Sequence, residues 1–301
     1  DGAKIMKNTR TAAIAEAFLA AVFYAVNMPA SKALLGHIAP TIMAGLLYLG
    51  AGIGIWLLSL TAGKKLAAKE RLSKADLPYT IGMIVLDIIA PICLMLGLSH
   101  TTSANASLLN NFEIVATALL ALALFHEAIS RRLWGAILLV TASSCILSFE
   151  GASSFHLSWG SLLVLLAATC WGLENNCTRK IASKDTFEIV TLKGIFSGSG
   201  SLMVGFLLGE RLPPPAYGLL ALLLGFVAYG LSIYFYIRAQ HVIGAARTSA
   251  YYAVAPFVGA LLSFVFLREP LSTRYFIALG LMFIGSLILV ADTLIPSQKH
   301  S

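Results

Sequence analysis

Charged residues are scarce in this sequence. Only 12% of its 301 residues are Asp, Glu, Lys or Arg, whereas soluble domains average about 25%. This deficit excludes an ordinary water-covered surface. Hydrophobic residues make up 58% of the chain, and most segments are apolar on every side, unlike the surface helices of a soluble protein. The composition therefore predicts an integral membrane protein.

The sequence also lacks the motifs of the main membrane-bound and ATP-driven enzyme classes. It contains no His-Glu-x-x-His, Gly-x-Ser-x-Gly or Walker sequence. Its four cysteines lie in apolar segments without metal-ligand spacing, and we interpret them as buried hydrophobic residues. We therefore expect no enzyme activity, no cofactor, no metal site and no nucleic-acid partner. An intramembrane enzyme is kept as the alternative from another functional class.

Ten apolar stretches are long enough to cross a bilayer, which takes about 20 helical residues. Short polar breaks separate them. The predicted fold class is an all-α integral membrane protein with ten transmembrane helices. The expected spans are 11–32, 40–62, 78–98, 102–125, 132–150, 157–179, 187–208, 215–237, 246–267 and 273–293.

Lysine and arginine are distributed unequally between the predicted loops. Ten spans place both termini on one side, and 16 of the 21 basic residues lie in the termini or loops of that side. Four lie in the opposite loops, and Lys193 lies inside a span. Because basic loops remain cytoplasmic, we expect both termini in the cytoplasm of a multi-pass protein of the cell's inner membrane.

The two halves of the chain resemble each other. Leu124–Ser130 aligns with Phe266–Ser272 at a shift of 142 residues, and Ala20–Tyr24 aligns with Ala167–Trp171 at a shift of 147. Each half contains five spans, and an odd number forces the halves to insert in opposite orientations. This predicts two inverted five-helix repeats within one membrane domain, at residues 1–153 and 154–301.

A signature near the ninth stretch carries a family resemblance. Tyr251–Leu262, running on to Leu267–Ser272, resembles the ninth-helix signature of the EamA family in the drug/metabolite transporter superfamily. The resemblance implies a central cavity lined by the first, third, fourth, sixth, eighth and ninth helices, and a small organic solute that is often exported. Glu127 and Glu269 recur at opposite membrane edges, and we interpret them as loop-fixing residues.

Two positions depart from the family pattern. Glu113-Ile114 stands in the first half where the second half has Ala255-Pro256, so the helix-bending proline is replaced and a carboxylate lies beside its place. Many members carry an arginine about eight residues after the proline of the second helix. Here Pro40 is followed by Leu47 and Tyr48 instead. The resemblance therefore implies no anion clamp at that position.

Two acidic residues, Asp87 and Glu113, lie near the middle of predicted spans. A charge at the bilayer centre costs about 2.5–3.5 kcal/mol, so both must face protein or water. They are expected near the midplane on consecutive antiparallel helices, where two carboxylates can bind a cation or share a proton. The alternative is structural, with each carboxylate accepting hydrogen bonds from Ser107, Asn110 or Asn111.

Glu174 and Lys193 form a second charged set, closer to the expected cytoplasmic end of their helices. Their matching depth on consecutive antiparallel helices favours an ion pair. Such a pair could be a gate that breaks when a solute arrives. It could equally be a fixed strut at a helix bend, and the sequence leaves both interpretations open.

Polar and aromatic side chains also gather in several spans, often three or four residues apart on one helix face. This pattern predicts a cavity suited to a zwitterion or an amphiphilic cation. Anchoring at the membrane interface is the alternative interpretation of the aromatic residues. The candidate substrate-binding residues are Tyr24, Asn27, Asp87, Ser107, Asn110, Asn111, Glu113, Trp171, Glu174, Asn175, Tyr229, Tyr251 and Tyr252. The candidates for a gate or for proton coupling are Asp87, Glu113, Glu174 and Lys193.

These observations lead to a hypothesis of secondary transport. We expect export of a small polar or amphiphilic, amino-acid-like metabolite by alternating access, either coupled to protons or running downhill. The alternative within transport is uptake of an organic cation, with Asp87, Glu113 and aromatic rings as its receptor. A channel is a further alternative, which inverted five-helix repeats favour less. The expected partners are a small-molecule substrate and the lipid bilayer, and the oligomeric state is left open.

Overall fold

The computed structural model describes residues 2–61, 71–126, 129–150, 156–181, 183–243, 248, 251–269 and 271–294. Three features predicted above lie outside this part of the chain. They are the span ends at 62 and 246, the boundary between the halves at 153 and 154, and Glu127.

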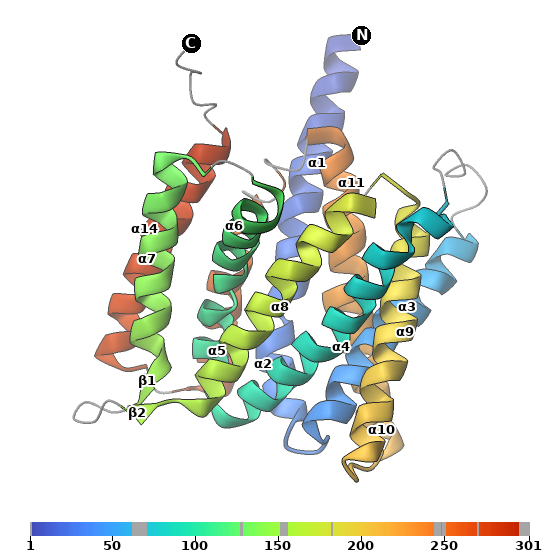
Figure 1. The fold of residues 1–301 in the computed structure, drawn as a ribbon, viewed down its shortest axis with the longest axis vertical. Coiled ribbons are helices and arrows are strands. Elements are labelled where there is room, and N and C mark those ends of the chain that lie inside the picture. The colour runs from blue at the N-terminus through green and yellow to red at the C-terminus, as the bar shows by residue number, and fades with distance from the viewer. Residues whose placement is uncertain are drawn as a thin grey trace.

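Helices make up most of the described residues (Figure 1). The first half contains α1 (Gly2–Ala25), α2 (Asn27–Leu34), α3 (Pro40–Thr61), the short η2 (Lys74–Asp76), α4 (Leu77–His100), α5 (Ser103–Leu109), α6 (Phe112–Phe125) and α7 (Arg131–Ser148). The second contains α8 (Trp159–Ile181), α9 (Thr186–Leu207), α10 (Pro215–Gly225), the π-helical η3 (Phe226–Leu231), α11 (Ser232–Ile243), α13 (Ala255–Leu267) and α14 (Thr273–Leu294). Two short antiparallel strands, β1 (Phe149–Glu150) and β2 (His156–Leu157), lie between α7 and α8.

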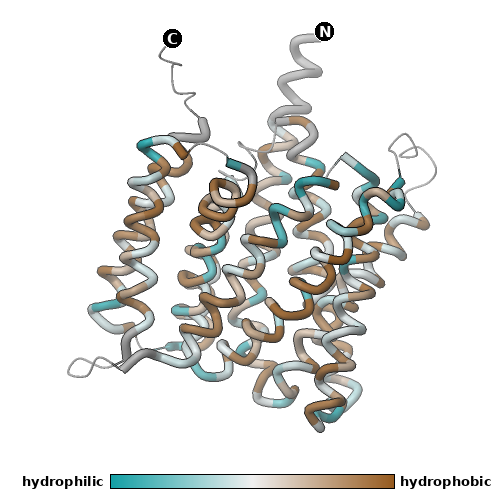
Figure 2. Tube along the Cα trace, viewed as in Figure 1, coloured by the Kyte–Doolittle hydropathy of each residue, from teal (hydrophilic) through white to brown (hydrophobic). Residues whose placement is uncertain are grey.

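The helices confirm the predicted membrane fold. Seven described helical segments are long and apolar enough to cross a bilayer, and Ala255–Leu267 is a shorter apolar helix. Together with α7 and α8, they make the ten predicted crossings within the described residues. Hydrophobic residues predominate along the helices (Figure 2). Large apolar side chains such as Leu138, Leu207 and Phe266 are mostly exposed, as expected for a surface that faces lipid.

The two halves are inverted relative to each other. In Figure 1, α1 runs away from the end of the molecule that holds the N-terminus, whereas α8 runs towards that end. His126 and Arg268, which are 142 residues apart, both cap a helix in the left-handed conformation, with φ of 54° and 50°. They are the two non-glycine residues with positive φ in the described part of the chain. The predicted repeat is therefore visible in the backbone itself.

Several crossings are interrupted near their middle. α1 gives way to α2 at Val26, α5 to α6 at Asn110 and Asn111, and a turn at Ala253 and Val254 precedes α13. The crossing that begins with α10 instead contains the π-helical turn. Interruptions of this kind release backbone groups and redirect side chains, and they are tolerated in membranes only where protein or water surrounds them.

Glycines bring the halves into close contact between α3 and α9. A Cβ atom on Gly194 would lie 2.3 Å from the Gly52 backbone nitrogen, and one on Gly198 would lie 2.6 Å from the Leu49 nitrogen. Backbone therefore packs directly on backbone here, as in other membrane helix pairs with small residues at the interface. This packing positions Tyr48 of α3 and Lys193 of α9 beside the centre of the molecule.

Candidate solute-binding site

Three charged side chains meet in the protein interior and are called here the charged triad: Asp87, Glu174 and Lys193. The Lys193 Nζ atom lies 3.1 Å from Asp87 Oδ2 and 3.0 Å from Glu174 Oε1. Asp87 of α4 is fully buried and Glu174 of α8 is 2% exposed. Charges removed from water in this way must be paired. The structure thus joins Glu174 to Lys193 and extends the pair to Asp87.

Two aromatic residues complete the surroundings of Asp87. The Tyr48 hydroxyl donates a hydrogen bond of 2.9 Å to Asp87 Oδ1. The Trp171 Nε1 atom lies 3.2 Å from the same oxygen and 3.1 Å from the Tyr48 hydroxyl. Glu174 in turn accepts a hydrogen bond from the Thr178 hydroxyl. The triad is therefore held by α3, α4, α8 and α9, which come from both halves.

The expected pairing of Asp87 with Glu113 is wrong. Glu113 begins α6 and accepts a hydrogen bond of 2.7 Å from the Asn175 side-chain amide of α8. The same amide lies 3.3 Å from the Thr117 hydroxyl. Asp87 instead binds Lys193, because a nearby cation compensates a buried carboxylate better than a second anion does.

The structural alternative for these carboxylates is also wrong in its partners. Ser107, Asn110 and Asn111 make no printed contact with Asp87 or Glu113 among the described residues. Asn110 donates 3.1 Å to the Tyr24 hydroxyl, and Asn111 donates 3.2 Å to the Ser286 hydroxyl of α14. The interruption between α5 and α6 therefore separates the directions of these side chains from that of Glu113.

Four tyrosines gather next to the triad and are called here the tyrosine cluster: Tyr24, Tyr48, Tyr229 and Tyr252. The Tyr229 ring lies 5.2 Å from the Tyr48 ring and 5.8 Å from the Tyr24 ring. Tyr24 lies 5.9 Å from Tyr252. These spacings are typical of interacting aromatic rings. The cluster forms a continuous aromatic surface that begins at the hydroxyl bound to Asp87.

Polar groups satisfy the hydroxyls of this cluster. The Asn27 amide donates 3.0 Å to the Tyr229 hydroxyl, and the Ser31 hydroxyl donates 2.9 Å to the Asn27 oxygen. The Tyr252 hydroxyl lies 3.4 Å from the Ser232 hydroxyl. Asn27, Tyr229 and Tyr252 therefore lie together, as a shared site requires.

Two predicted site residues face elsewhere. Asn111 binds α14, as described above, and the Tyr251 ring packs on Phe18 with 5.3 Å between ring centres. Phe18 is 43% exposed, so Tyr251 lies near the outer surface of α1. Neighbouring residues of a helix point about 100° apart. Asn110 and Tyr252 therefore face the centre, whereas Asn111 and Tyr251 do not.

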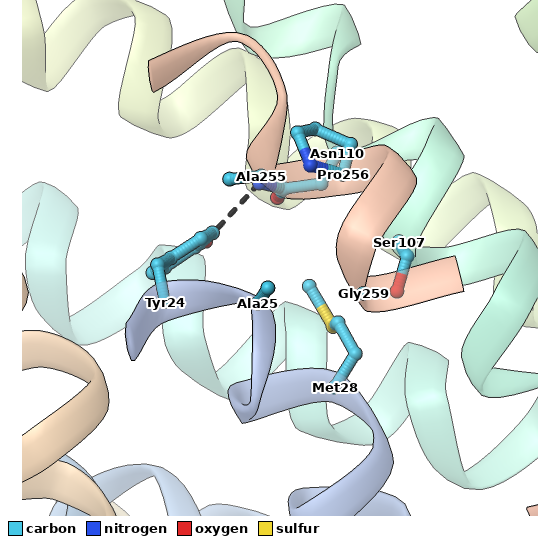
Figure 3. Close-up of a pocket in the computed structure, with 8 residues that line it drawn as sticks. All are labelled: Tyr24, Ala25, Met28, Ser107, Asn110, Ala255, Pro256 and Gly259. Atoms are coloured by element: carbon cyan, nitrogen blue, oxygen red, sulfur yellow. Dashed lines mark hydrogen bonds between the residues drawn. The ribbon is translucent and has the colours of Figure 1, made fainter. Parts of the chain in front are cut away.

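A small pocket lies beside the tyrosine cluster, where the interruptions of three crossings converge (Figure 3). Its walls include Tyr24, Met28, Pro256 and Gly259. The free volume is about 10 Å³, enough for about one water molecule. Ser107 Oγ and Asn110 Oδ1 also border it, and neither atom has a hydrogen-bond partner in the described part of the chain.

Tyr48 is the main site residue that the sequence analysis missed. It stands on α3 where many EamA members carry an arginine, and it uses its hydroxyl to bind Asp87. The departure from the family pattern was itself the available signal. Thr117 and Thr178 were also missed, because isolated threonines in apolar helices give little indication of their partners.

Comparison with known proteins gives the family. A model of the EamA-like transporter family matches residues 11–149 and 158–291. The chain belongs to the EamA-like transporter family. The two matched segments correspond to the two halves of the fold, and they cover each of the residues in the triad and the tyrosine cluster.

Curated relatives point the same way. An uncharacterized transporter of Methanothermobacter thermautotrophicus is 26% identical over 288 residues, covering 90% of this chain and 83% of the relative. Uncharacterized transporter YyaM of Bacillus subtilis is 24% identical, with 93% of each chain covered. One solved crystal structure with 17% sequence identity gives a TM-score of 0.68 and covers 96% of this chain and 99% of that chain. That likeness concerns the fold, whereas the family and the relatives support a transporter role for this multi-pass EamA protein.

Proposed function

We propose that this EamA protein is a secondary transporter that exports a small polar or amphiphilic, amino-acid-like metabolite by alternating access. The observation that carries the proposal is the buried triad, in which Lys193 binds Asp87 and Glu174 at 3.1 and 3.0 Å. Asp87 belongs to the first half, and the other two residues belong to the second. A solute that binds here therefore acts on the contact between the halves.

The charges of the triad suit a zwitterion. The ammonium group of a solute can compete with Lys193 for Asp87 and Glu174, and its carboxylate can bind Lys193 in exchange. The neighbouring tyrosine rings favour a cationic or apolar group through their faces. Exchange of internal ion pairs for solute contacts gives a physical route from binding to movement of one half against the other.

Glu113 supports coupling to protons. Its described hydrogen-bond partner is the neutral Asn175 amide at 2.7 Å, and no ion pair to it is found among the described residues. A carboxylate held in this way can bind a proton without disrupting the triad. Glu113 is therefore the residue through which a proton gradient would drive export in this proposal.

The proposed orientation places both termini in the cytoplasm of the inner membrane. It rests on the 16 basic residues of the terminal side against four on the other. The alternative function is uptake of an organic cation. The excess of acidic groups favours it, since Asp87, Glu113 and Glu174 surround the single buried Lys193.

Transport by the reconstituted protein tests both functions. Proteoliposomes would be loaded with labelled zwitterionic amino acids or with quaternary ammonium ions, and efflux would be followed with and without a proton gradient. We expect amino-acid efflux that Lys193→Gln abolishes and that Glu113→Gln separates from the proton gradient. Retained cation flux in Lys193→Gln would favour the alternative. Absence of any flux from folded protein would overturn both.

A further inference from the structure

The inverted repeat places equivalent residues in two interfaces of different chemistry. The shift of 147 pairs Asn27 with Glu174, and the shift of 142 pairs Asp87 with Tyr229. Asn27 donates to the Tyr229 hydroxyl at 3.0 Å, whereas Glu174 and Asp87 are joined through Lys193. The same positions therefore meet in both halves, as a neutral contact on the α1 side and as an ionic contact on the α8 side.

The next layer of the α8 side is polar. Asn175 binds Glu113 at 2.7 Å and Thr117 at 3.3 Å, so its amide fills the space between α6 and α8. A Cβ atom on Gly172 would lie 2.6 Å from the Ala116 Cβ atom, which shows that the two helices are tightly packed. The α8 side is thus closed by hydrogen bonds and by helix contact.

The equivalent layer of the α1 side is apolar and less completely filled. The repeat pairs Asn175 with Met28, Glu113 with Ala255 and Thr117 with Gly259. All three of these α1-side counterparts line the pocket of Figure 3. The replacement of an amide, a carboxylate and a hydroxyl by a thioether, a methyl group and a hydrogen atom leaves both the space and its apolar walls.

Two buried oxygens in this pocket are left without partners. Ser107 is 2% exposed and Asn110 is 5% exposed, yet Ser107 Oγ and Asn110 Oδ1 have no hydrogen-bond partner in the described part of the chain. A buried acceptor without a donor costs about 1–3 kcal/mol. The pocket therefore favours an occupant that brings a hydrogen-bond donor.

Gly259 fixes the size of that occupant. A Cβ atom built on Gly259 would lie 3.0 Å from Ser107 Oγ and 3.2 Å from the Ala25 carbonyl oxygen. One methyl group would therefore fill much of the present space, and a longer group would have to displace the flexible Met28 side chain. The pocket as built fits one or two non-hydrogen atoms.

We infer that this pocket is a specificity subsite that receives a short side chain bearing one hydrogen-bond donor, while the charged head of the same solute binds on the α8 side. The inference rests on the proposed function and deepens it. It fixes the orientation of the solute across the tyrosine cluster, from the triad to Gly259. It also selects short hydroxyl-bearing zwitterions over both bare and long-chain ones.

A set of amino acids tests the subsite on the full-length protein. Glycine carries the head alone, serine and 2-aminobutyrate differ by one hydroxyl against one methyl group, and norvaline is one methylene longer. Binding of each would be measured by thermal stabilisation in detergent and by competition for transport in proteoliposomes. We expect serine to bind at least tenfold more tightly than 2-aminobutyrate, because only serine satisfies a buried acceptor.

Three variants assign the preference to the pocket. Gly259→Ala should fill the space and weaken serine binding about tenfold while leaving glycine unchanged. Met28→Ala should enlarge it and raise the relative affinity for norvaline about fourfold for the added methylene. Gly280→Ala of α14 is the matched control, since an added Cβ meets no described atom within 4 Å there, and it should change neither ratio.

The outcomes separate the subsite from the proposed function. Binding of all four amino acids, with ratios that Gly259→Ala and Met28→Ala leave unchanged, overturns the subsite alone and leaves a zwitterion site at the triad. Failure of all four to bind wild-type protein overturns the proposed substrate class and the subsite with it. Met28→Ala keeps the test decisive if Gly259→Ala does not fold, because the two variants change the pocket in opposite directions.

Discussion

The two ends of the molecule are closed by different kinds of contact. At the end remote from the N-terminus of α1, Glu269 accepts hydrogen bonds of 2.7 and 2.8 Å from the Ser103 and Ala104 backbone amides at the start of α5. Glu210 does the same for Thr41 and Ile42 at the start of α3, at 3.3 and 2.9 Å. Carboxylates favour these positions because a helix N-terminus carries free amides and a partial positive charge.

The end near the N-terminus is closed by an exposed contact. Arg238 of α11 lies 2.8 Å from Glu16 of α1, and its side chain is 53% exposed. The arginine also lies over the Tyr234 ring, 5.7 Å from its centre. Exposed ion pairs contribute little, whereas partly buried charge-assisted bonds contribute more. The comparison teaches that separation of the halves costs less at the end that holds Arg238.

The strongest test concerns the triad that lies between these ends. Lys193→Met should leave Asp87 and Glu174 buried without a cation, and it should destabilise the protein by about 3–5 kcal/mol. Thermal unfolding in detergent would measure the loss. The triple variant with Asp87→Asn and Glu174→Gln should recover much of it, because neutral side chains need no cation. Equal stability of Lys193→Met and wild type would show that the triad does not hold the halves together.

The remote end gives the next largest effect. Glu269→Ala removes two charge-assisted hydrogen bonds to α5, each contributing about 1.5–3 kcal/mol. We expect the remote end to open, so that a cysteine introduced at Ser263 in a cysteine-free background reacts faster with a membrane-impermeant maleimide. Glu210→Ala should act in the same direction through α3. Unchanged labelling in both variants would remove the contrast between the two ends.

A smaller effect is expected at Tyr48. Tyr48→Phe keeps the ring next to Tyr229 but removes the hydroxyl that donates to Asp87 at 2.9 Å. A hydrogen bond to a charged group contributes about 1.5–3 kcal/mol, and the Trp171 amine should replace part of this. The unfolding temperature should fall less than in Lys193→Met. A loss as large as that of Lys193→Met would place Tyr48, not the lysine, at the centre of the site.

Much of the fold could be predicted because hydropathy and repetition are properties of the chain alone. Ten apolar stretches gave the crossings, and the alignment of the regions around His126 and Arg268 gave the inversion. The loop-fixing interpretation of Glu269 is confirmed by its bonds to Ser103 and Ala104. Glu269 could be interpreted because it follows a helix end within a recognisable motif.

The partners inside the site could not be predicted in the same way. Depth along a helix placed Asp87 and Glu113 at similar levels, but it did not give the direction in which each side chain points. That direction depends on the interruption at Asn110 and Asn111 and on the close packing of α3 with α9, which brings Tyr48 and Lys193 to Asp87. One-dimensional spacing therefore found the residues, and packing decided which of them meet.

The smallest expected effect lies at the exposed end and sharpens the comparison most. Arg238→Ala removes the contact with Glu16, and stability should change by about 0–1 kcal/mol because such pairs are screened by water and salt. Accessibility should nevertheless rise at this end, since the arginine also covers the Tyr234 ring. A cysteine at Ser232, labelled in the Arg238→Ala and the parent cysteine-free proteins, would report it. A fall in stability as large as that of Glu269→Ala would show that both ends are held equally.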